Sequence, residues 1–546
     1  MLWLAATAYN ITKPYHIDDT AHLEIAEWIL SNPLNPMSGN VNWSDSSDPI
    51  HKLNQPHLYS YLLAGFIKLF GTNEIATHIF QSIFTFLSIL FFFKIAYHYS
   101  KTNAWLMTVL FVFCPAFFVG QNLMVDIPLV SLWIIYYYIL ITDDINSALF
   151  RYLLAGIVAS TALLIKYSSL ALLPALPIVI LFNRHYKFLI LACIPVIALL
   201  LWSLFNYVDY GSVHILGRPS QYMSTARITR ALFAWITCAG GMSIFNIVVI
   251  PGYSKRLNTI AARFANLLIF ILLFILMLII ALFLLGYIKE SFTNKILLLL
   301  FFANGLFIIL AMSFELTSNL KPYFNKRANV SEFLLHYWFL SGFSFIVLFS
   351  PFMATRHFLL VLPPILLILG KSTFTYNKRF FKATAIAISI FLSIMVGISD
   401  YSFAKYYKDN AKKIANKYTH DRKVWFSGHW GWQWYARLAG MEQIGIKLLS
   451  EVRAGDLLVF PEKIHEQKIL DRLSVKTIGC VFEQRPWYTF FSTAGTARFY
   501  ESSVKLVPWN LSKKPFGPIK IYEILAVKKV NAQSSLDQTS PKSDMN

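Results

Sequence analysis

The stretch ANLLIFILLFILMLIIALFLLG, residues 265–286, decides the fold class of this chain. It carries no charged side chain, and one α-helix of this length can cross roughly 30 Å of hydrocarbon. Because similar apolar runs recur along the chain, we predict an α-helical protein that spans the membrane many times. The other runs lie at residues 76–97, 104–121, 126–142, 150–182 (two runs), 188–207, 230–250, 296–314, 333–350, 357–370 and 382–399.

The composition of the whole chain agrees with a membrane protein. Of its 546 residues, 56% are apolar and 14% are charged, whereas a soluble globular protein carries about a quarter charged residues. The net charge of +20 would indicate nucleic acid in a soluble protein, but here it fits cytoplasmic loops rich in Lys and Arg. We therefore expect no nucleic-acid partner. The four cysteines show neither a disulfide framework nor zinc-ligand spacing.

Basic residues gather in alternate loops between the apolar runs, and loops of this kind stay in the cytoplasm. We therefore expect a multi-pass protein of the cell (inner) membrane. Loop 11–75 and everything after about residue 400 then lie on the external (periplasmic) side. The basic residues that mark the cytoplasmic side are Lys101, Arg184, Lys187, Lys255, Arg256, Arg263, Lys321, Lys326, Arg327, Lys371, Lys378, Arg379 and Lys382.

The chain divides into three predicted parts. Residues 1–399 form a transmembrane domain of about thirteen helices, of which the first, at residues 1–10, is too short to cross and looks truncated. Residues 400–528 contain alternating runs such as DLLVF (456–460) and KIYEILAV (520–527), which predict an extracytoplasmic α/β domain. The tail 529–546 has no apolar pattern, and we expect it to be disordered.

Loop 11–75 is long, and long ordered loops in compact folds tend to be functional. Its segment IDDTAHLEIAEWIL (17–30) has apolar residues at helical spacing, and QPHLYSYLLAGFIKLFG (55–71) is too short to span comfortably. Both segments predict helices that lie along the membrane surface. Asp18 or Asp19 can cap the first of them, and this structural role competes with a functional one.

Ionisable residues also interrupt the apolar runs at the external edge. Asp126 begins a run, Lys166 interrupts ALLIKYSSLALL, and Arg356 with His357 lies in FMATRHFLLVLPP. A lysine left in hydrocarbon costs at least about 2.5–3.5 kcal/mol, so Lys166 either extends to the membrane edge or meets an anion there. Asp126 can equally be a helix cap, and Arg356 can equally reach out to water.

Together these residues suit one kind of chemistry. If a sugar is carried on a lipid phosphate, the leaving phosphate must be held by cations such as Lys166 and Arg356. An acceptor hydroxyl must also lose its proton, which an aspartate within hydrogen-bond reach can take. A site at the membrane edge offers water to the sugar and lipid to the polyprenyl tail.

At these residues the chain resembles the polytopic GT-C type glycosyltransferases that use polyprenyl-phosphate sugars. Within that group it is similar to bacterial protein O-mannosyltransferase-like enzymes and to the aminoarabinose transferase of lipid A. The similar elements run in the same order along nearly all of residues 1–400. They are Asp18-Asp19 followed by HLEIA (22–26), QPHLYSYLLAGFIKLFG (55–71), Asp126 to Leu129, LIKY (164–167) and RHFLLVLPP (356–364); GHWGWQWYARLAG (428–440) also looks similar to a segment of such enzymes.

The resemblance implies an inverting transfer in which Asp18 is the general base, with Asp19 beside it as the second acid of the catalytic pair. Asp126 would lie near the donor or acceptor, and Lys166 and Arg356 near the phosphate. The other implied substrate-binding residues are Gln55, His57, Tyr59 and His357. The chain departs from the family pattern in three places: Asp19 is shorter than the usual Glu, His57 replaces a Pro, and Gln55 carries no charge.

In residues 424–440 the pattern predicts a strand, a turn at GHWG, and a helix ended by Gly440. His429 and Trp430 are candidate acceptor contacts, because indole rings can stack on sugar rings. Aromatic residues at this spacing are more often part of a core, and a lone His in a turn is usually neither an acid nor a metal ligand.

Three functions remain open from the sequence. The first is a glycosyltransferase that takes a polyprenyl-phosphate sugar as donor and a glycan, lipid or protein as acceptor, among membrane lipids. The second is a transporter or flippase of a lipid-linked glycan, although such proteins place charges near the midplane and often show repeated halves. The third is a membrane scaffold, which leaves Lys166 and Arg356 unexplained. A divalent metal is compatible with Asp18 and Asp126, but nothing requires it.

Overall fold

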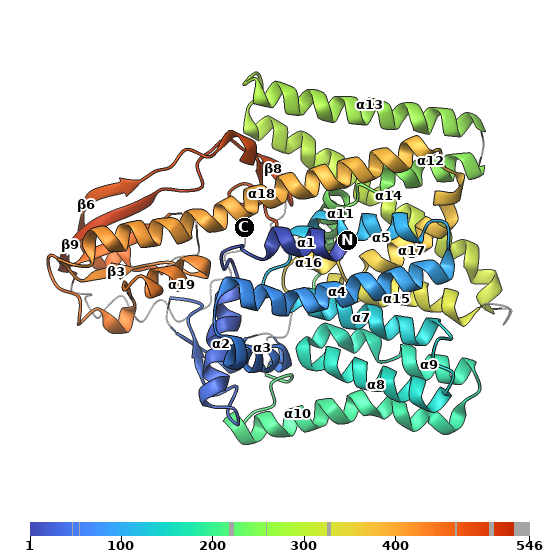
Figure 1. The fold of residues 1–546 in the computed structure, drawn as a ribbon, viewed down its shortest axis with the longest axis horizontal. Coiled ribbons are helices and arrows are strands. Elements are labelled where there is room, and N and C mark those ends of the chain that lie inside the picture. The colour runs from blue at the N-terminus through green and yellow to red at the C-terminus, as the bar shows by residue number, and fades with distance from the viewer. Residues whose placement is uncertain are drawn as a thin grey trace.

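The chain forms a helix bundle with a sheet at one end, as the computed structural model shows (Figure 1). The structure describes residues 1–45, 47–53, 55–217, 223–257, 259–324, 329–462, 464, 467–501 and 507–528. The tail predicted to be disordered, and the predicted cytoplasmic residues Lys326 and Arg327, lie outside these residues.

Helices make up most of the bundle and follow one another along the chain. They are α1 (Leu2–Asn10), α2 (Asp19–Ser31), α3 (Leu58–Phe70), α4 (Glu74–Tyr99), α5 (Ala104–Val112), α6 (Pro115–Val119), α7 (Asp126–Ile141), α8 (Ala148–Ile165), α9 (Ala175–Phe182), α10 (Ile194–Tyr210), α11 (Thr225–Met242), α12 (Asn246–Leu257), α13 (Thr259–Leu284), α14 (Glu290–Phe324), α15 (Val330–Phe349), α16 (Thr355–Phe358), α17 (Leu362–Thr373), α18 (Arg379–Tyr418) and α19 (Trp430–Leu438).

Among the described residues, seven helical segments are long and apolar enough to cross a membrane, and they include α4, α8, α13, α14, α15 and α18. The seventh, Tyr186–Tyr210, joins a short 3₁₀ helix to α10. An eighth crossing results if α11 and α12, bent by 94° at the break between them, form one span. Other predicted runs correspond to the shorter helices α5, α7, α9 and α17. The polytopic helical fold is confirmed, whereas the number of about thirteen crossings stays a prediction.

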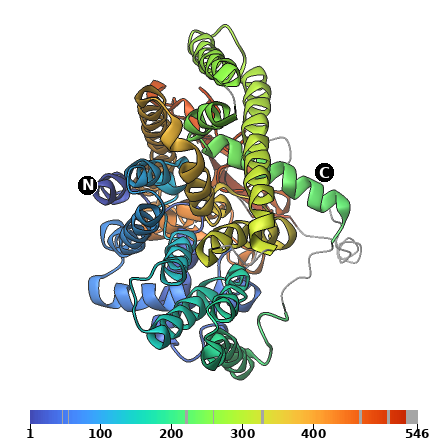
Figure 2. The same cartoon turned by 90° about the vertical axis from the view of Figure 1, so that its right-hand side faces the viewer.

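The stretch that decided the fold class forms α13, which lies on the outside of the bundle in both views (Figures 1 and 2). Its side chains Leu267, Phe274 and Met277 are exposed. An apolar surface of this extent is unfavourable in water but is tolerated by lipid tails. Exposure of this helix is therefore what a lipid-facing span requires.

One long helix connects the bundle to the sheet. Figure 1 shows α18 running from the helices at one end of the molecule along the sheet at the other. It continues without interruption from Arg379 to Tyr418. The predicted division between residues 399 and 400 falls inside this helix, because the sequence changes from apolar to charged while the backbone hydrogen bonding continues.

The region after α18 contains a mixed sheet with the strand order β4-β3-β5-β9-β6. Parallel pairs join β3 to β4 and to β5, and antiparallel pairs join β9 to β5 and to β6. The predicted strands 456–460 and 520–527 are confirmed as β5 and β9. The strands of the chain are β1 (Asn40–Val41), β2 (Asp48–Pro49), β3 (Val424–Phe426), β4 (Glu442–Gln443), β5 (Leu457–Pro461), β6 (Leu473–Val481), β7 (Phe491–Ser492), β8 (Asn510–Leu511) and β9 (Ile519–Val527).

Helix α19 connects the parallel strands β3 and β4, and it packs against α2 of loop 11–75. The predicted strand and helix in residues 424–440 are confirmed, with Gly440 at φ +87° just after the helix. The helix begins at Trp430, inside the stretch GHWG that was predicted to be a turn. The two helices predicted in loop 11–75 are also confirmed as α2 and α3, which pack on each other. Their position along a membrane surface stays a prediction.

Candidate active site

Arg356 is the centre of an ion cluster that joins segments far apart in the sequence. Its Nη2 lies 3.1 Å from Oδ2 of Asp18, and its Nε lies 3.3 Å from Oδ2 of Asp126. The other oxygen of Asp126 accepts a 2.9 Å hydrogen bond from Nζ of Lys166. The structure therefore brings together four of the residues predicted from the sequence, two carboxylates and two cations.

Local structure explains how each side chain reaches the cluster. Asp126 is the first residue of α7, and Lys166 follows the last turn of α8 in an extended conformation before a short 3₁₀ helix, Tyr167–Leu172. Arg356 lies in the one-turn helix α16, between α15 and α17. Breaks in the apolar helices thus place ionisable groups where they can meet each other, which removes the cost of leaving them unpaired.

The carboxylate of Asp18 does not cap its own helix. Asp18 occupies the N-cap position of α2, but its side chain makes no capping hydrogen bond and is directed instead to Arg356. The side chain is 24% exposed, so a substrate group can reach it. Burial raises the pKa of Asp18 and Arg356 opposes this shift. A carboxylate with a raised pKa is a better proton acceptor.

The residue before it is strained. Ile17 has φ +50°, a left-handed conformation that is rare for a β-branched residue. Such strain costs on the order of 1–3 kcal/mol and persists only where the surroundings enforce it. The strained turn at Ile17 directs Asp18 and Asp19 into different environments.

Asp19 lies in a second, fully buried environment. Its Oδ2 accepts a 2.7 Å hydrogen bond from the backbone N–H of His16, and the residue is 0% exposed. Burial raises the pKa of Asp19 to about 8, which holds it protonated near neutral pH. The two members of the predicted acid pair therefore differ, and only Asp18 belongs to the Arg356 cluster.

A buried network beside Asp19 was not predicted from the sequence. Nζ of Lys13 lies 2.5 Å from Oδ2 of Asp400 and donates a 2.7 Å hydrogen bond to Oδ1 of Asn122. Asp400 also accepts hydrogen bonds from Tyr500 and Thr493, at 2.7 and 2.8 Å. The only sequence signal for these residues is that Lys13 and Asp400 lie at the ends of apolar runs, where ionisable residues are common.

The remaining predicted site residues lie around loop 11–75 and α16. His57 is the buried N-cap residue of α3, and Gln55 is half-buried two residues before it. The hydroxyl of Tyr59 donates a 2.9 Å hydrogen bond to Gln81 and is fully buried. His357 is buried, with Nδ1 accepting from the N–H of Ala354 at 3.3 Å. Their roles as substrate-binding residues stay predictions.

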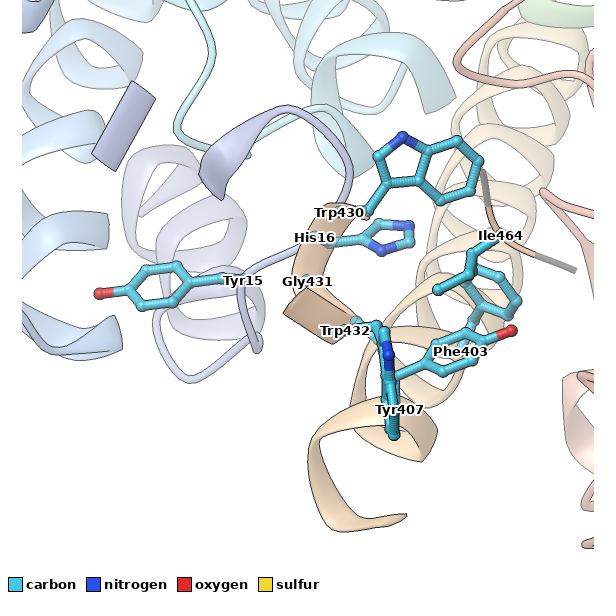
Figure 3. Close-up of a pocket in the computed structure, with 9 residues that line it drawn as sticks. Tyr15, His16, Phe403, Tyr407, Trp430, Gly431, Trp432 and Ile464 are labelled. Atoms are coloured by element: carbon cyan, nitrogen blue, oxygen red, sulfur yellow. The ribbon is translucent and has the colours of Figure 1, made fainter. Parts of the chain in front are cut away.

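The candidate acceptor contacts His429 and Trp430 lie where α19 begins. Both ring nitrogens of His429 have partners, with Gln433 at 3.0 Å and Gln467 at 3.2 Å, and the residue is buried. Trp430 is half-buried and lines a small pocket (Figure 3). In that pocket His16 lies among Trp430, Trp432 and residues of α18, whereas the ring of Tyr15 points away. Contact of His429 or Trp430 with an acceptor stays a prediction.

Among the residues that the structure describes, no group of three or more His, Cys, Asp or Glu side chains could hold a metal ion. The cluster pairs its carboxylates with Lys166 and Arg356 instead. Its donor set therefore fits an anion that binds to the two cations, with the carboxylates nearby.

Comparison with known proteins agrees with these observations. Residues 54–207 match the family model described as dolichyl-phosphate-mannose-protein mannosyltransferase. No curated protein matches the chain.

Among solved structures, the chain is similar to ArnT from Cupriavidus metallidurans bound to undecaprenyl phosphate. The TM-score is 0.50 at 10% identity, over 97% of this chain and 97% of that chain. ArnT in the apo state matches with TM-score 0.42 and 12% identity, over 97% of each chain. The oligosaccharyltransferase of Archaeoglobus fulgidus, tethered with an acceptor peptide, matches with TM-score 0.45 and 11% identity, over 81% of this chain and 63% of that chain.

The likeness to undecaprenyl-phosphate-bound ArnT shows that this chain has the same fold. The family match covers a segment that includes α3, α4, α7, α8 and most of α10, with Asp126 and Lys166. The predicted resemblance to polytopic glycosyltransferases is thereby confirmed in this segment and in the fold.

Proposed function

We propose that this chain is an inverting glycosyltransferase that moves a sugar from a polyprenyl-phosphate donor to an acceptor hydroxyl at the external face of the membrane. The observation that carries the proposal is Arg356, which contacts Asp18 and Asp126 at once while Lys166 holds the other oxygen of Asp126. A general base and two cations for a leaving phosphate thus lie within one cluster.

The reaction follows from these positions. The acceptor oxygen forms a bond to the anomeric carbon as its proton passes to Asp18. The bond between that carbon and the phosphate oxygen breaks, and the electron pair stays on the phosphate, whose charge Lys166 and Arg356 stabilise. When the donor phosphate binds to Arg356, it competes with Asp18 for the guanidinium, which frees the carboxylate to face the acceptor.

Asp18, rather than Asp19, is the base in this proposal. The Asp18 side chain is accessible and pairs with a cation that the phosphate can displace. Asp19 is buried, protonated near neutral pH, and hydrogen-bonded to His16. A carboxyl in that condition can orient the loop but is poorly placed to accept a proton from a substrate.

Substitution of Asp18 tests the proposal. The purified full chain in lipid nanodiscs, given a labelled polyprenyl-phosphate sugar and an envelope glycolipid or glycoprotein fraction, should transfer the label. We expect Asp18→Asn to lower kcat by about 10²–10⁴-fold, because Asn can still accept from Arg356 but cannot take a proton. Glu27→Gln, a conservative change of a partly exposed residue of the same helix that pairs with Arg437, should leave transfer unchanged.

Two outcomes would contradict this assignment. Full transfer by the Asp18→Asn protein, with its helical content intact, would show that another group takes the proton. Movement of labelled donor across proteoliposome membranes without any covalent change would favour the transporter or flippase instead.

A further inference from the structure

Among the described residues of loop 11–75, the buried histidines His16, His22 and His57 each have a ring nitrogen without a hydrogen-bond partner. That of His16 lies 3.7 Å from Oδ1 of Asp400, which leaves His22 and His57. His22 lies one turn after Asp18 on α2, so both side chains project from the same face of the helix. His57 precedes the first turn of α3. Among the described residues, Nδ1 of His22 and Nε2 of His57 have no hydrogen-bond partner, although the residues are only 5% and 2% exposed. Such groups are rare in folded proteins, and each needs an explanation.

The surroundings keep both rings neutral. Burial lowers the pKa of His22 to about 4 and that of His57 to about 3. His22 also feels the charges of the neighbouring cluster, and its ring lies edge-on to Tyr59 at 5.3 Å. The titratable groups that act on the pair are Asp126, Arg356 and Lys166 for His22, and His22 and His214 for His57.

His214 is already engaged, which distinguishes it from the other two. One of its ring nitrogens lies 2.8 Å from the hydroxyl of Tyr167, and the other lies 2.7 Å from the carbonyl oxygen of Leu53. His214 therefore has its hydrogen bonds within the protein, whereas His22 and His57 each keep a nitrogen for a ligand.

The charges of the cluster show what a ligand would need. Asp18 and Asp126 balance Lys166 and Arg356, so the cluster has no net charge. A phosphodiester adds one negative charge to this partly buried site, and an uncompensated buried charge is costly. A histidine that takes up a proton supplies the missing positive charge, because its ordinary pKa lies near neutrality.

We propose that His22 and His57 bind the phosphate of the lipid-linked donor, and that the pair takes up one proton from solvent as the phosphate binds. The identity of the ligand, a lipid-linked phosphate, rests on the proposed function. The neutral pair in the free protein then becomes one cation and one neutral hydrogen-bonding ring. This adds a third positive charge beside Lys166 and Arg356, which stabilises the leaving phosphate in the same way.

Proton-linked binding tests this inference without turnover. The probe is farnesyl methyl phosphate, a diester whose own charge stays constant across the pH range and which carries no sugar to transfer. We expect its Kd for the full chain to rise about tenfold per pH unit from about pH 5 to about pH 7. The reason is that the complex holds one proton more than the free protein and the free ligand together. Calorimetry in buffers of different ionisation enthalpy should record uptake of about one proton.

Substitutions then identify the groups that take up the proton. His22→Gln and His57→Gln keep a hydrogen-bonding side chain but cannot be protonated. We therefore expect the Kd of at least one single variant to be nearly independent of pH. The double variant should behave in the same way. His98→Gln, at an exposed position at the end of α4, is the matched control and should behave like the unaltered protein.

The results distinguish failure of the proposed function from failure of the inference about the histidines. If the unaltered protein does not bind the diester, the proposed function fails. If it binds with no pH dependence and no proton uptake, the inference about the histidines is wrong while the phosphate site stands. A pH dependence that persists in the double variant would assign the proton to another group of the site, such as Asp18, Asp126 or His357, and would also overturn the inference.

Discussion

Asp18 and Asp19 are adjacent and chemically identical, yet their side chains have different roles. Asp18 contacts Arg356 and is accessible, whereas Asp19 is buried and accepts a hydrogen bond from His16. The strained conformation of Ile17 and the start of α2 separate the two carboxyl groups. A sequence pattern assigns a role to the pair, but only the environment of each residue says which member reacts.

The raised pKa of Asp19 predicts a dependence of stability on pH. In the unfolded chain this carboxyl ionises near its ordinary pKa, but in the folded protein it stays protonated up to about pH 8. The folded state therefore loses stability relative to the unfolded state as the pH rises between these values. Asp19→Asn keeps an acceptor for the N–H of His16 and cannot ionise.

We expect the stability of Asp19→Asn relative to the unaltered protein to increase from about pH 4 to about pH 8 by at least ~1 kcal/mol, and then to level off. Denaturation monitored at several pH values measures this gap. His16, whose pKa burial lowers to about 4, titrates in both proteins and cancels from the difference. A gap that stays constant with pH would show that Asp19 is already ionised in the folded state.

At the scale of elements, α19 packs the region that contains the sheet against loop 11–75. A chain of hydrogen bonds runs from His429 to Gln433 and on to Glu24 of α2, at 3.0 Å for each step. The hydroxyl of Tyr435 accepts from the backbone N–H of Tyr15 at 2.7 Å. Helix α19 therefore supports the segment that leads into Asp18, and its aromatic residues Trp432 and Trp434 are buried as core.

Gly431 lets α19 approach the backbone of loop 11–75 closely. A Cβ at this position would lie 2.0 Å from the carbonyl oxygen of Tyr15, a backbone atom that cannot move aside easily. We expect Gly431→Ala to lower the free energy of unfolding by about 1–3 kcal/mol and to reduce transfer, because the loop before Asp18 must shift.

Gly445→Ala is the matched control, since a Cβ there meets no atom within 4 Å and the backbone at this residue is extended. Thermal unfolding and limited proteolysis of both variants compare the effects. Equal stability of the two variants would show that α19 does not pack as closely against the backbone of Tyr15 as the structure indicates.

At the scale of the whole molecule, the network around Asp400 joins three parts of the chain. Lys13 comes from the loop after α1, Asp400 from the middle of α18, and Tyr500 from the region after α18. Figure 1 shows α18 passing from the bundle to the sheet, and the contacts of Asp400 in this helix join the start of the chain to the region after α18. The same network lies next to His16 and thereby next to Asp19.

Removal of one partner of the Lys13–Asp400 ion pair should therefore lower the stability of the protein more than removal of both partners. Asp400→Leu leaves the fully buried Lys13 without its carboxylate, and we expect a loss of about 3–5 kcal/mol in stability. The double variant Lys13→Met with Asp400→Leu should be more stable than Asp400→Leu alone, although Tyr500 and Thr493 still lose an acceptor. Thermal unfolding of the single and double variants measures the coupling, and strictly additive effects would argue against a direct ion pair.

Several features could be predicted from the sequence because each depends on local properties. The apolar runs predicted a polytopic helical protein, and alternating patterns predicted β5 and β9. Apolar residues at helical spacing and a short apolar run predicted the two helices of loop 11–75. Asp126, Lys166 and Arg356 were identifiable because an ionisable residue in an apolar run is expensive and needs a partner. The family motifs then indicated which chemistry such partners serve.

Tertiary structure alone decided which of these residues meet. Arg356 bridges Asp18 and Asp126, whereas Asp19 accepts a hydrogen bond from His16 instead. His22 lies near the charges of the cluster and His57 near His22, each with an unpaired ring nitrogen. No local pattern contains this information, because hydrophobic burial is nondirectional and depends on summed area, whereas an ion pair depends on a few ångströms between segments hundreds of residues apart. The sequence by itself therefore determined the kind of protein and the candidate residues, and the packing of the helices determined the site.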